Sequence, residues 1–110
     1  MKILITGCAG FIGYHLAAKL SKNKKNKVFG IDNFDNYYSI NLKKKRLALL
    51  KSFKNFFFKK IDILNEKKLQ NYFKKKRFDV IFHLAAQAGV RYSILNPKKY
   101  MRNNIQGFFN

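Results

Sequence analysis

The hydrophobic positions of this chain form short continuous runs that alternate with longer stretches of helical spacing. A short apolar run bounded by turn residues is typical of a strand buried in a parallel sheet, and apolar residues repeated every three or four positions indicate an amphipathic helix. The runs predict strands at residues 2–6, 28–31, 56–60 and 79–83. The spaced stretches predict helices at residues 11–22, 41–53 and 65–76, and a fourth helix that begins at Pro97.

The regular alternation of strand and helix specifies the class of fold. Strands joined by helices pair in parallel through right-handed crossovers, and the helices then cover both faces of the sheet. We therefore expect an α/β fold, a Rossmann-type doubly wound parallel sheet that is truncated after about four strands. Residues 91–96 are expected to form a loop before the last helix.

The carboxyl-terminal part of the pattern has no closing strand. The last predicted helix runs into Gly107-Phe108-Phe109-Asn110, and the two phenylalanines look suited to partners that the chain lacks. We therefore expect residues 1–110 to be a partial dinucleotide-binding domain, with the substrate domain absent, that derives from a fragment or a truncated reading frame.

Composition adds a large positive charge to this picture. The chain has 24 Lys and Arg against 5 Asp and Glu, a net charge of +19. The lysines are spread along predicted helix faces and turns, so we interpret them as a solvated surface, with a nucleic-acid footprint as the alternative. No apolar run approaches the roughly 20 residues that span a membrane. The lone Cys8 and the missing leader pattern favour a cytoplasmic protein.

A glycine-rich loop directly follows the first predicted strand and leads into the first predicted helix. It reads Gly7-Cys8-Ala9-Gly10-Phe11-Ile12-Gly13, a G-x-x-G-x-x-G spacing. Gly7 permits the tight turn, Gly10 lets the backbone approach a diphosphate, and Gly13 lets helix and strand pack closely. The amino terminus of the helix offers free N–H groups to the phosphates. The alternative for such a triplet is a purely structural turn.

Acidic residues follow the second and third predicted strands, at the edge of a parallel sheet where ligands bind. Asp32 stands about 20 residues beyond the glycine loop, the position from which a carboxylate accepts hydrogen bonds from the adenosine ribose. Its charge favours NAD over NADP, although the basic residues 43–46 lie nearby. Asn33 closes the same strand and is included in the predicted cofactor site. Asp62 is placed to meet the adenine or to be a simple turn residue.

Small residues follow the fourth predicted strand. Leu84-Ala85-Ala86 would let the backbone pass close to the middle of a cofactor, and tight packing is the alternative explanation. We expect His83, which ends the strand, to be a packed and hydrogen-bonded residue without a catalytic role.

Three stretches, GCAGFIG at 7–13, GIDNFDNYY at 30–38 and HLAAQAGVRYS at 83–93, identify a resemblance to the extended short-chain dehydrogenase/reductase family. Within that family the sequence is most similar to UDP-glucuronate 4-epimerases, and it covers about the first third of a member. The resemblance implies a Rossmann domain that holds NAD and an enzyme, usually a homodimer, that inverts C4 of a UDP-sugar by transient oxidation. No metal and no membrane partner is implied.

The resemblance also assigns roles by position. It implies that Lys43 reaches the adenosine ribose, that Asn104 lies on a helix beside the active site, and that Arg91 either approaches the acidic UDP-sugar or is a surface cation. The residues implied to line the cofactor are Gly7, Gly10, Phe11, Ile12, Asp32, Asp62, Ile63, Leu84, Ala85 and Ala86.

The catalytic Ser/Thr and Tyr-x-x-x-Lys of the family have no counterpart in this chain. Tyr72 and Lys76 match the letters of the pair, but they precede the fourth predicted strand, so we assign Tyr72 to helix packing and Lys76 to solvent. We therefore expect no catalytic residue here and a fragment that is inactive alone. The alternatives are a stand-alone NAD-binding module and a basic nucleic-acid-binding protein.

Overall fold

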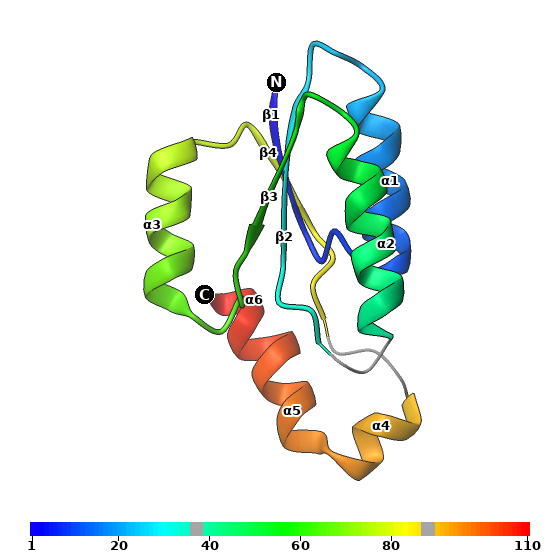
Figure 1. The fold of residues 1–110 in the computed structure, drawn as a ribbon. Coiled ribbons are helices and arrows are strands. Elements are labelled where there is room, and N and C mark those ends of the chain that lie inside the picture. Colours follow the sequence, from blue (N-terminus) through cyan, green and yellow to red (C-terminus); the bar gives the residue numbers. More distant parts are fainter. Residues whose placement is uncertain (36–38, 87–89) are drawn as a thin grey trace.

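The computed structural model describes residues 1–35, 39–86 and 90–110, and the side chains of residues 90–92 lie outside this description. Four parallel strands form one sheet in the spatial order β3-β2-β1-β4, so that β1 lies in the interior and the chain reverses direction across the sheet at β1 (Figure 1). The strands are β1 at Lys2–Thr6, β2 at Lys27–Asp32, β3 at Phe56–Lys60 and β4 at Val80–His83.

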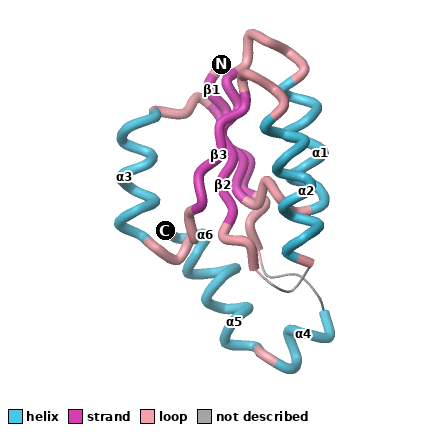
Figure 2. The backbone as a smooth tube through the Cα atoms, in the orientation of Figure 1, coloured by secondary structure: helices cyan, strands magenta, loops and turns pink. Residues whose placement is uncertain are grey.

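Helices cover both faces of this sheet. Figures 1 and 2 show α1 and α2 on one face, α3 on the other, and the carboxyl-terminal helices below the sheet. This arrangement confirms the predicted doubly wound α/β fold. The helices are α1 at Phe11–Ser21, α2 at Ile40–Lys51, α3 at Glu66–Lys76, α4 at Val90–Leu95 and α5 at Pro97–Met101, followed by a π-helical segment at Arg102–Gln106 and α6 at Gly107–Phe109.

Two apolar clusters lie on opposite faces of the sheet because successive side chains of a strand alternate between faces. Ile3 and Ile5 of β1 pack with Leu47 and Leu50 of α2 in the first cluster. Leu4, between them in sequence, packs in the second cluster with the α3 residues Leu69 and Tyr72. Most β1 and β2 side chains are therefore buried on both faces, which explains why their sequences are continuous apolar runs rather than alternating ones.

Side-chain caps fix the starts of the helices that follow the second and third strands. Ser39 Oγ accepts a hydrogen bond from the Leu42 amide at 3.4 Å, and Asn65 Oδ1 accepts one from the Lys68 amide at 3.1 Å. Each cap satisfies a backbone donor that the first turn of a helix leaves open. The predicted helix at residues 65–76 therefore begins as expected, with Asn65 as its cap.

The carboxyl-terminal region differs from the sequence-based expectation. The loop predicted at residues 91–96 is wrong, because Val90–Leu95 forms α4. A helix does begin at Pro97, as predicted, and Asn96 caps it. Phe108 and Phe109 are 71% and 83% exposed. The expectation that the chain lacks a partner for them is wrong for Phe108, because its ring centre lies 5.3 Å from that of His83. No described helix is both long and apolar enough to cross a membrane.

Candidate functional site

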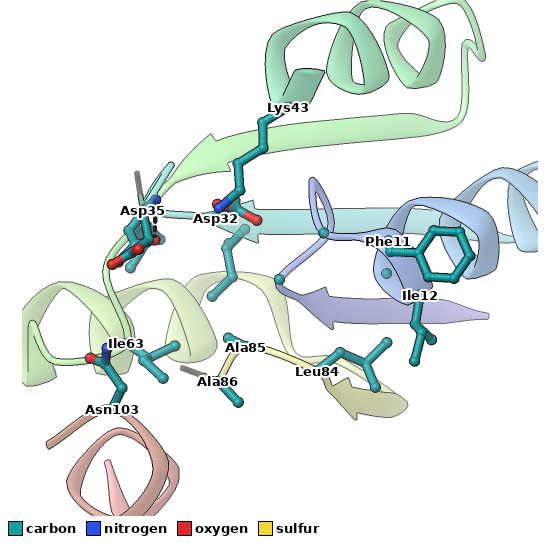
Figure 3. A pocket seen from close by; sticks show the side chains of 16 residues that line it. Phe11, Ile12, Asp32, Asp35, Lys43, Ile63, Leu84, Ala85, Ala86 and Asn103 are labelled. Atoms are coloured by element: carbon teal, nitrogen blue, oxygen red, sulfur yellow. Dashed lines mark hydrogen bonds and ion pairs between the residues drawn. The ribbon is translucent and has the colours of Figure 1, made fainter. Parts of the chain in front are cut away.

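A cavity of about 310 Å³ opens at the carboxyl ends of the strands. The turn between β1 and α1 forms one wall, the ends of β2 and β3 form another, and the segment after β4 closes the floor (Figure 3). Ligands of open parallel sheets bind at this edge, where the direction of the chain reverses. The lining residues are Gly7, Gly10, Phe11, Ile12, Gly13, Ile31, Asp32, Asn33, Asp35, Lys43, Ile61, Ile63, Leu84, Ala85, Ala86 and Asn103.

The glycine loop is packed so tightly that side chains are excluded at two of its positions. Gly7 has a φ of 73°, and a Cβ there would lie 2.9 Å from the Ala85 nitrogen. A Cβ on Gly13 would lie 2.1 Å from the Gly7 carbonyl oxygen. Glycine is therefore required for the positive φ at Gly7 and for the contact of α1 with the loop.

The amino terminus of α1 opens into the cavity without a side-chain cap. Gly10 is the N-cap residue, and no side chain accepts from the first-turn amides. Those amides have no intrahelical acceptor, and they carry the positive end of the helix dipole. Phe11 and Ile12 are exposed at this terminus. The arrangement fits a diphosphate, which would supply the missing acceptors.

Asp32 lies at the end of β2 and is held by three groups. Its Oδ2 accepts from the Ala9 amide at 3.0 Å, its Oδ1 accepts from the Phe34 amide at 2.8 Å, and Lys43 Nζ lies 3.8 Å from Oδ1. The side chains of Asp32 and Lys43 are only 4% and 8% exposed. Because a carboxylate has about four acceptor positions, Asp32 can still accept hydroxyl groups from the cavity.

A second ion pair lies at the rim of the cavity. Asp35, which follows β2, pairs with Lys99 of α5 at 2.9 Å. Asn103, in the π-helical segment, also lines the cavity and is almost fully buried (Figure 3). The carboxyl-terminal helices are thereby tied to the end of β2.

A hydroxyl group joins the ends of β1 and β4. Thr6 Oγ1 accepts from the amides of Leu84 and Ala85, both at 3.0 Å, and lies 2.7 Å from His83 Nδ1. With both lone pairs engaged, the hydroxyl donates its proton to Nδ1, so we infer the neutral imidazole with the proton on Nε2. Burial lowers the pKa of His83 and favours the same neutral form. These contacts agree with a packed, hydrogen-bonded role for His83.

The cavity brings together all of the predicted cofactor residues except Asp62 and Asn104. Asp62 Oδ1 instead accepts from the Leu64 amide at 2.9 Å, as a turn residue does. The side chain of Arg91 lies outside the described residues. The roles of all these residues in binding a ligand stay predictions. The residues that line the cavity as predicted are Gly7, Gly10, Phe11, Ile12, Gly13, Asp32, Asn33, Lys43, Ile63, Leu84, Ala85 and Ala86.

Four lining residues were missed by the sequence analysis: Ile31, Asp35, Ile61 and Asn103. Ile31 and Ile61 directly precede the predicted residues Asp32 and Asp62, so their positions at strand ends were a usable signal. Asn103 takes the place expected for its neighbour Asn104. A π-helical turn has more residues per turn than an α-helix and changes which side faces the sheet, and nothing in the sequence marked that turn.

The thiol of Cys8, the phenol of Tyr72 and the amine of Lys76 do not line the cavity. Burial, followed by the nearby Asp32 charge, raises the pKa of the Cys8 thiol, and the side chain is fully buried. Burial also raises the pKa of Tyr72 to about 12, and its ring packs against Phe78. Lys76 was expected in solvent but is half-buried, with Nζ 5.4 Å from the centre of the Phe29 ring. No cluster of metal-binding side chains occurs among the described residues.

Relatives of known sequence and structure match nearly the whole chain. Protein CapI of Staphylococcus aureus is 50% identical over 110 residues, which are 100% of this chain and 32% of that protein. UDP-glucuronate 4-epimerase 4 of Arabidopsis thaliana is 45% identical over 108 residues, 98% of this chain and 24% of that enzyme. The chain thus spans a third or less of the length of these relatives.

Solved structures give the same result. The UDP-glucuronic acid 4-epimerase from Bacillus cereus, in complex with UDP-glucuronic acid and NAD, has a TM-score of 0.88 and 42% identity over 97% of this chain and 33% of that one. A UDP-glucose 4-epimerase from Thermotoga maritima has a TM-score of 0.80 and 35% identity over 99% of this chain and 32% of that one. Residues 4–110 match the protein family described as GDP-mannose 4,6 dehydratase, and the chain therefore belongs to that family of short-chain dehydrogenase/reductase-type proteins.

Proposed function

We propose that this chain binds NAD and forms the amino-terminal, cofactor-binding part of a UDP-sugar 4-epimerase whose substrate is UDP-glucuronate. The observation that carries the proposal is a single cavity that joins an uncapped helix amino terminus to the carboxylate of Asp32. Relatives that include UDP-glucuronate 4-epimerases, and neighbours solved with NAD, support the choice of cofactor and sugar. Because the chain spans between a quarter and a third of those proteins, the reaction belongs to the whole enzyme.

Different residues of the cavity would bind different parts of the dinucleotide. The first-turn amides of α1 would bind the diphosphate, since they are donors without acceptors and lie at the positive end of the helix dipole. Asp32 would accept the ribose hydroxyls, and Lys43 holds that carboxylate in place. The small side chains of Ala85 and Ala86 would let the rest of the cofactor pass over the end of β4. When bound, NAD supplies hydride acceptance and return at the sugar C4.

We assign no catalytic residue to this chain. Tyr72 packs in the core and does not line the cavity, so it has no route to a substrate there. His83 Nδ1 is engaged by the Thr6 hydroxyl. We therefore expect the 110-residue chain, mixed with NAD and UDP-glucuronate, to form no UDP-galacturonate. Product formation by the isolated chain would contradict this assignment.

Thermal unfolding with and without NAD tests the proposal. A ligand at a hundred times its Kd stabilises the folded state by about 2.7 kcal/mol, which is roughly 10 °C in Tm for a domain of this size. We expect this shift in the wild-type chain and in Glu66→Gln, which removes an exposed carboxylate from α3. We expect most of it to be lost in Asp32→Asn. An equal shift in all three proteins would overturn the proposed site.

The same measurement addresses the charge of the chain. A protein of net charge +19 attracts anions without a specific site. NAD and NADP should therefore be compared at about 0.15 M salt, where exposed charges are largely screened. We expect the larger shift with NAD, because a 2′-phosphate would approach the Asp32 carboxylate.

A further inference from the structure

Ala9 of the glycine loop is held on both sides by charged side chains, one at each of the two peptide groups that flank its Cα. Its N–H donates to Asp32 Oδ2 at 3.0 Å, and its C=O accepts from Arg46 Nη1 at 3.1 Å. Ala9 itself is fully buried. Asp32 comes from the end of β2 and holds the Cys8–Ala9 peptide. Arg46 comes from α2 and holds the next one, the Ala9–Gly10 peptide.

The position of this peptide makes its orientation important. Ala9 directly precedes Gly10, and peptides beside glycine rotate more easily than others because glycine lacks the Cβ that restricts them. Gly10 is the N-cap of α1, whose first-turn amides open into the cavity. If the Ala9–Gly10 peptide rotated, its carbonyl dipole and the amides that follow would no longer keep their present direction. Donors that are fixed before a ligand arrives bind it more tightly than donors that must be ordered by it.

We propose that Arg46 is a positioning residue that locks the Ala9–Gly10 peptide and so presets the diphosphate-binding amides. The inference rests on the proposed function, because it assumes that a diphosphate binds there. Arg46 is not among the residues that line the cavity, so it acts through Ala9 and not by touching the ligand.

The two cations of α2 have separate partners in this arrangement. Lys43 and Arg46 are three positions apart and therefore share one side of the helix. Lys43 Nζ lies beside Asp32 Oδ1, whereas Arg46 donates to the loop carbonyl. Asp32 and Lys43 form the proposed ribose end of the cavity, whereas Arg46 contacts the glycine loop. Loss of Arg46 should therefore weaken diphosphate binding and leave adenosine binding unchanged.

Titrations of the 110-residue chain with ADP and with adenosine, followed by NMR at constant salt, test this division. We expect Arg46→Gln to lower the ratio of ADP affinity to adenosine affinity about tenfold, the effect of one charge-assisted hydrogen bond. Lys45→Gln is the matched control, because it removes an exposed charge from the same helix. We expect it to keep the wild-type ratio, and we expect Arg46→Lys, which retains a donor, to restore part of the ratio.

Hydrogen exchange of the Gly10 amide gives an independent measurement on the unliganded proteins, because the Ala9–Gly10 peptide is anchored by Arg46 at its C=O and by the Gly7 carbonyl, 3.0 Å from the Gly10 nitrogen, at its N–H. We expect faster exchange in Arg46→Gln than in Lys45→Gln, because the peptide loses one of its two anchors. A general loss of stability would instead speed exchange throughout the core and lower both affinities together, which would overturn the positioning role. An unchanged ADP-to-adenosine ratio in Arg46→Gln would overturn it as well, while leaving the proposed function intact. A wild-type chain that binds neither ADP nor NAD would overturn both.

Discussion

Removal of the Asp32 carboxylate should destabilise the protein even when no ligand is present. In Asp32→Ala, the Lys43 ammonium would stay buried without its ion-pair partner, and the amides of Ala9 and Phe34 would lose their acceptors. Breaking a buried ion pair by removing one partner costs about 3–5 kcal/mol. Each amide left without a partner adds about 1–3 kcal/mol, and these costs are not additive.

We therefore expect Asp32→Ala to lower the free energy of unfolding by about 3–5 kcal/mol. Small domains have a total stability of about 5–15 kcal/mol, so the variant should lie close to its unfolding threshold. Urea denaturation followed by circular dichroism measures the difference. The slope of the transition should stay the same, since the surface exposed on unfolding is nearly unchanged.

A second substitution separates the charge from the hydrogen bonds. In Asp32→Ala/Lys43→Met the unpaired ammonium is replaced by an apolar side chain of similar length, so the double variant should be more stable than Asp32→Ala alone. It should stay less stable than wild type by about 1–3 kcal/mol, because the two amides still lack an acceptor. The reasoning fails if Asp32→Ala unfolds within 1 kcal/mol of wild type, or if the double variant is no more stable than the single one.

Three further predictions follow from the geometry of the site. Burial lowers the pKa of His83 in the folded protein, so the unfolded chain binds a proton more readily. The free energy of unfolding should therefore be highest above about pH 6.5, the ordinary pKa of histidine, and should fall as the pH drops below that value. Urea titrations between pH 7 and 5 should show this fall in wild type and a smaller one in His83→Asn. Because burial raises the pKa of Cys8, a thiol reagent at pH 8 should label it only after denaturation, and rapid labelling of the folded chain would contradict its burial. Gly13→Ala should cost about 1–3 kcal/mol or more because its Cβ meets the Gly7 carbonyl at 2.1 Å, whereas Gly10→Ala, with its Cβ at 3.2 Å, should cost less in urea denaturation.

The fold was predictable because local patterns and tertiary packing agree over most of the chain. The apolar runs at β1 and β3 match the observed strands residue for residue, since strands buried on both faces or rich in phenylalanine have no competing helical pattern. The helix at Val90–Leu95 was missed for the opposite reason. It has only six residues, Ile94 and Leu95 are both exposed, and so short a segment carries no usable periodicity.

The candidate site was predictable where the backbone itself forms it. Glycine spacing and strand ends identify the turn at residues 7–13 and the position of Asp32, because these features depend on chain geometry alone. Asp62 occupies a similar strand end, yet its carboxylate caps its own turn, a choice that depends on a local hydrogen bond. The contact of Arg46 with Ala9 joins segments 37 residues apart, and no sequence pattern indicates which of four consecutive basic residues would make it.

The cavity contains two acidic residues, Asp32 and Asp35, although we propose that it binds an anionic ligand. The pairing of both carboxylates with lysines explains how the two are compatible. Asp32 is paired with Lys43, and Asp35 is paired with Lys99, so neither adds an uncompensated negative charge where a diphosphate would bind. The carboxylate oxygens of Asp32 can still accept ribose hydroxyls, and a 2′-phosphate placed against those same oxygens would be repelled. A diphosphate bound at the glycine loop instead meets carboxylates whose charge is offset by the paired lysines. The net charge of +19 gives the molecule a positive field that attracts anions. Specificity for a dinucleotide must therefore come from the geometry of the glycine loop and of Asp32, since the field alone would attract any polyanion.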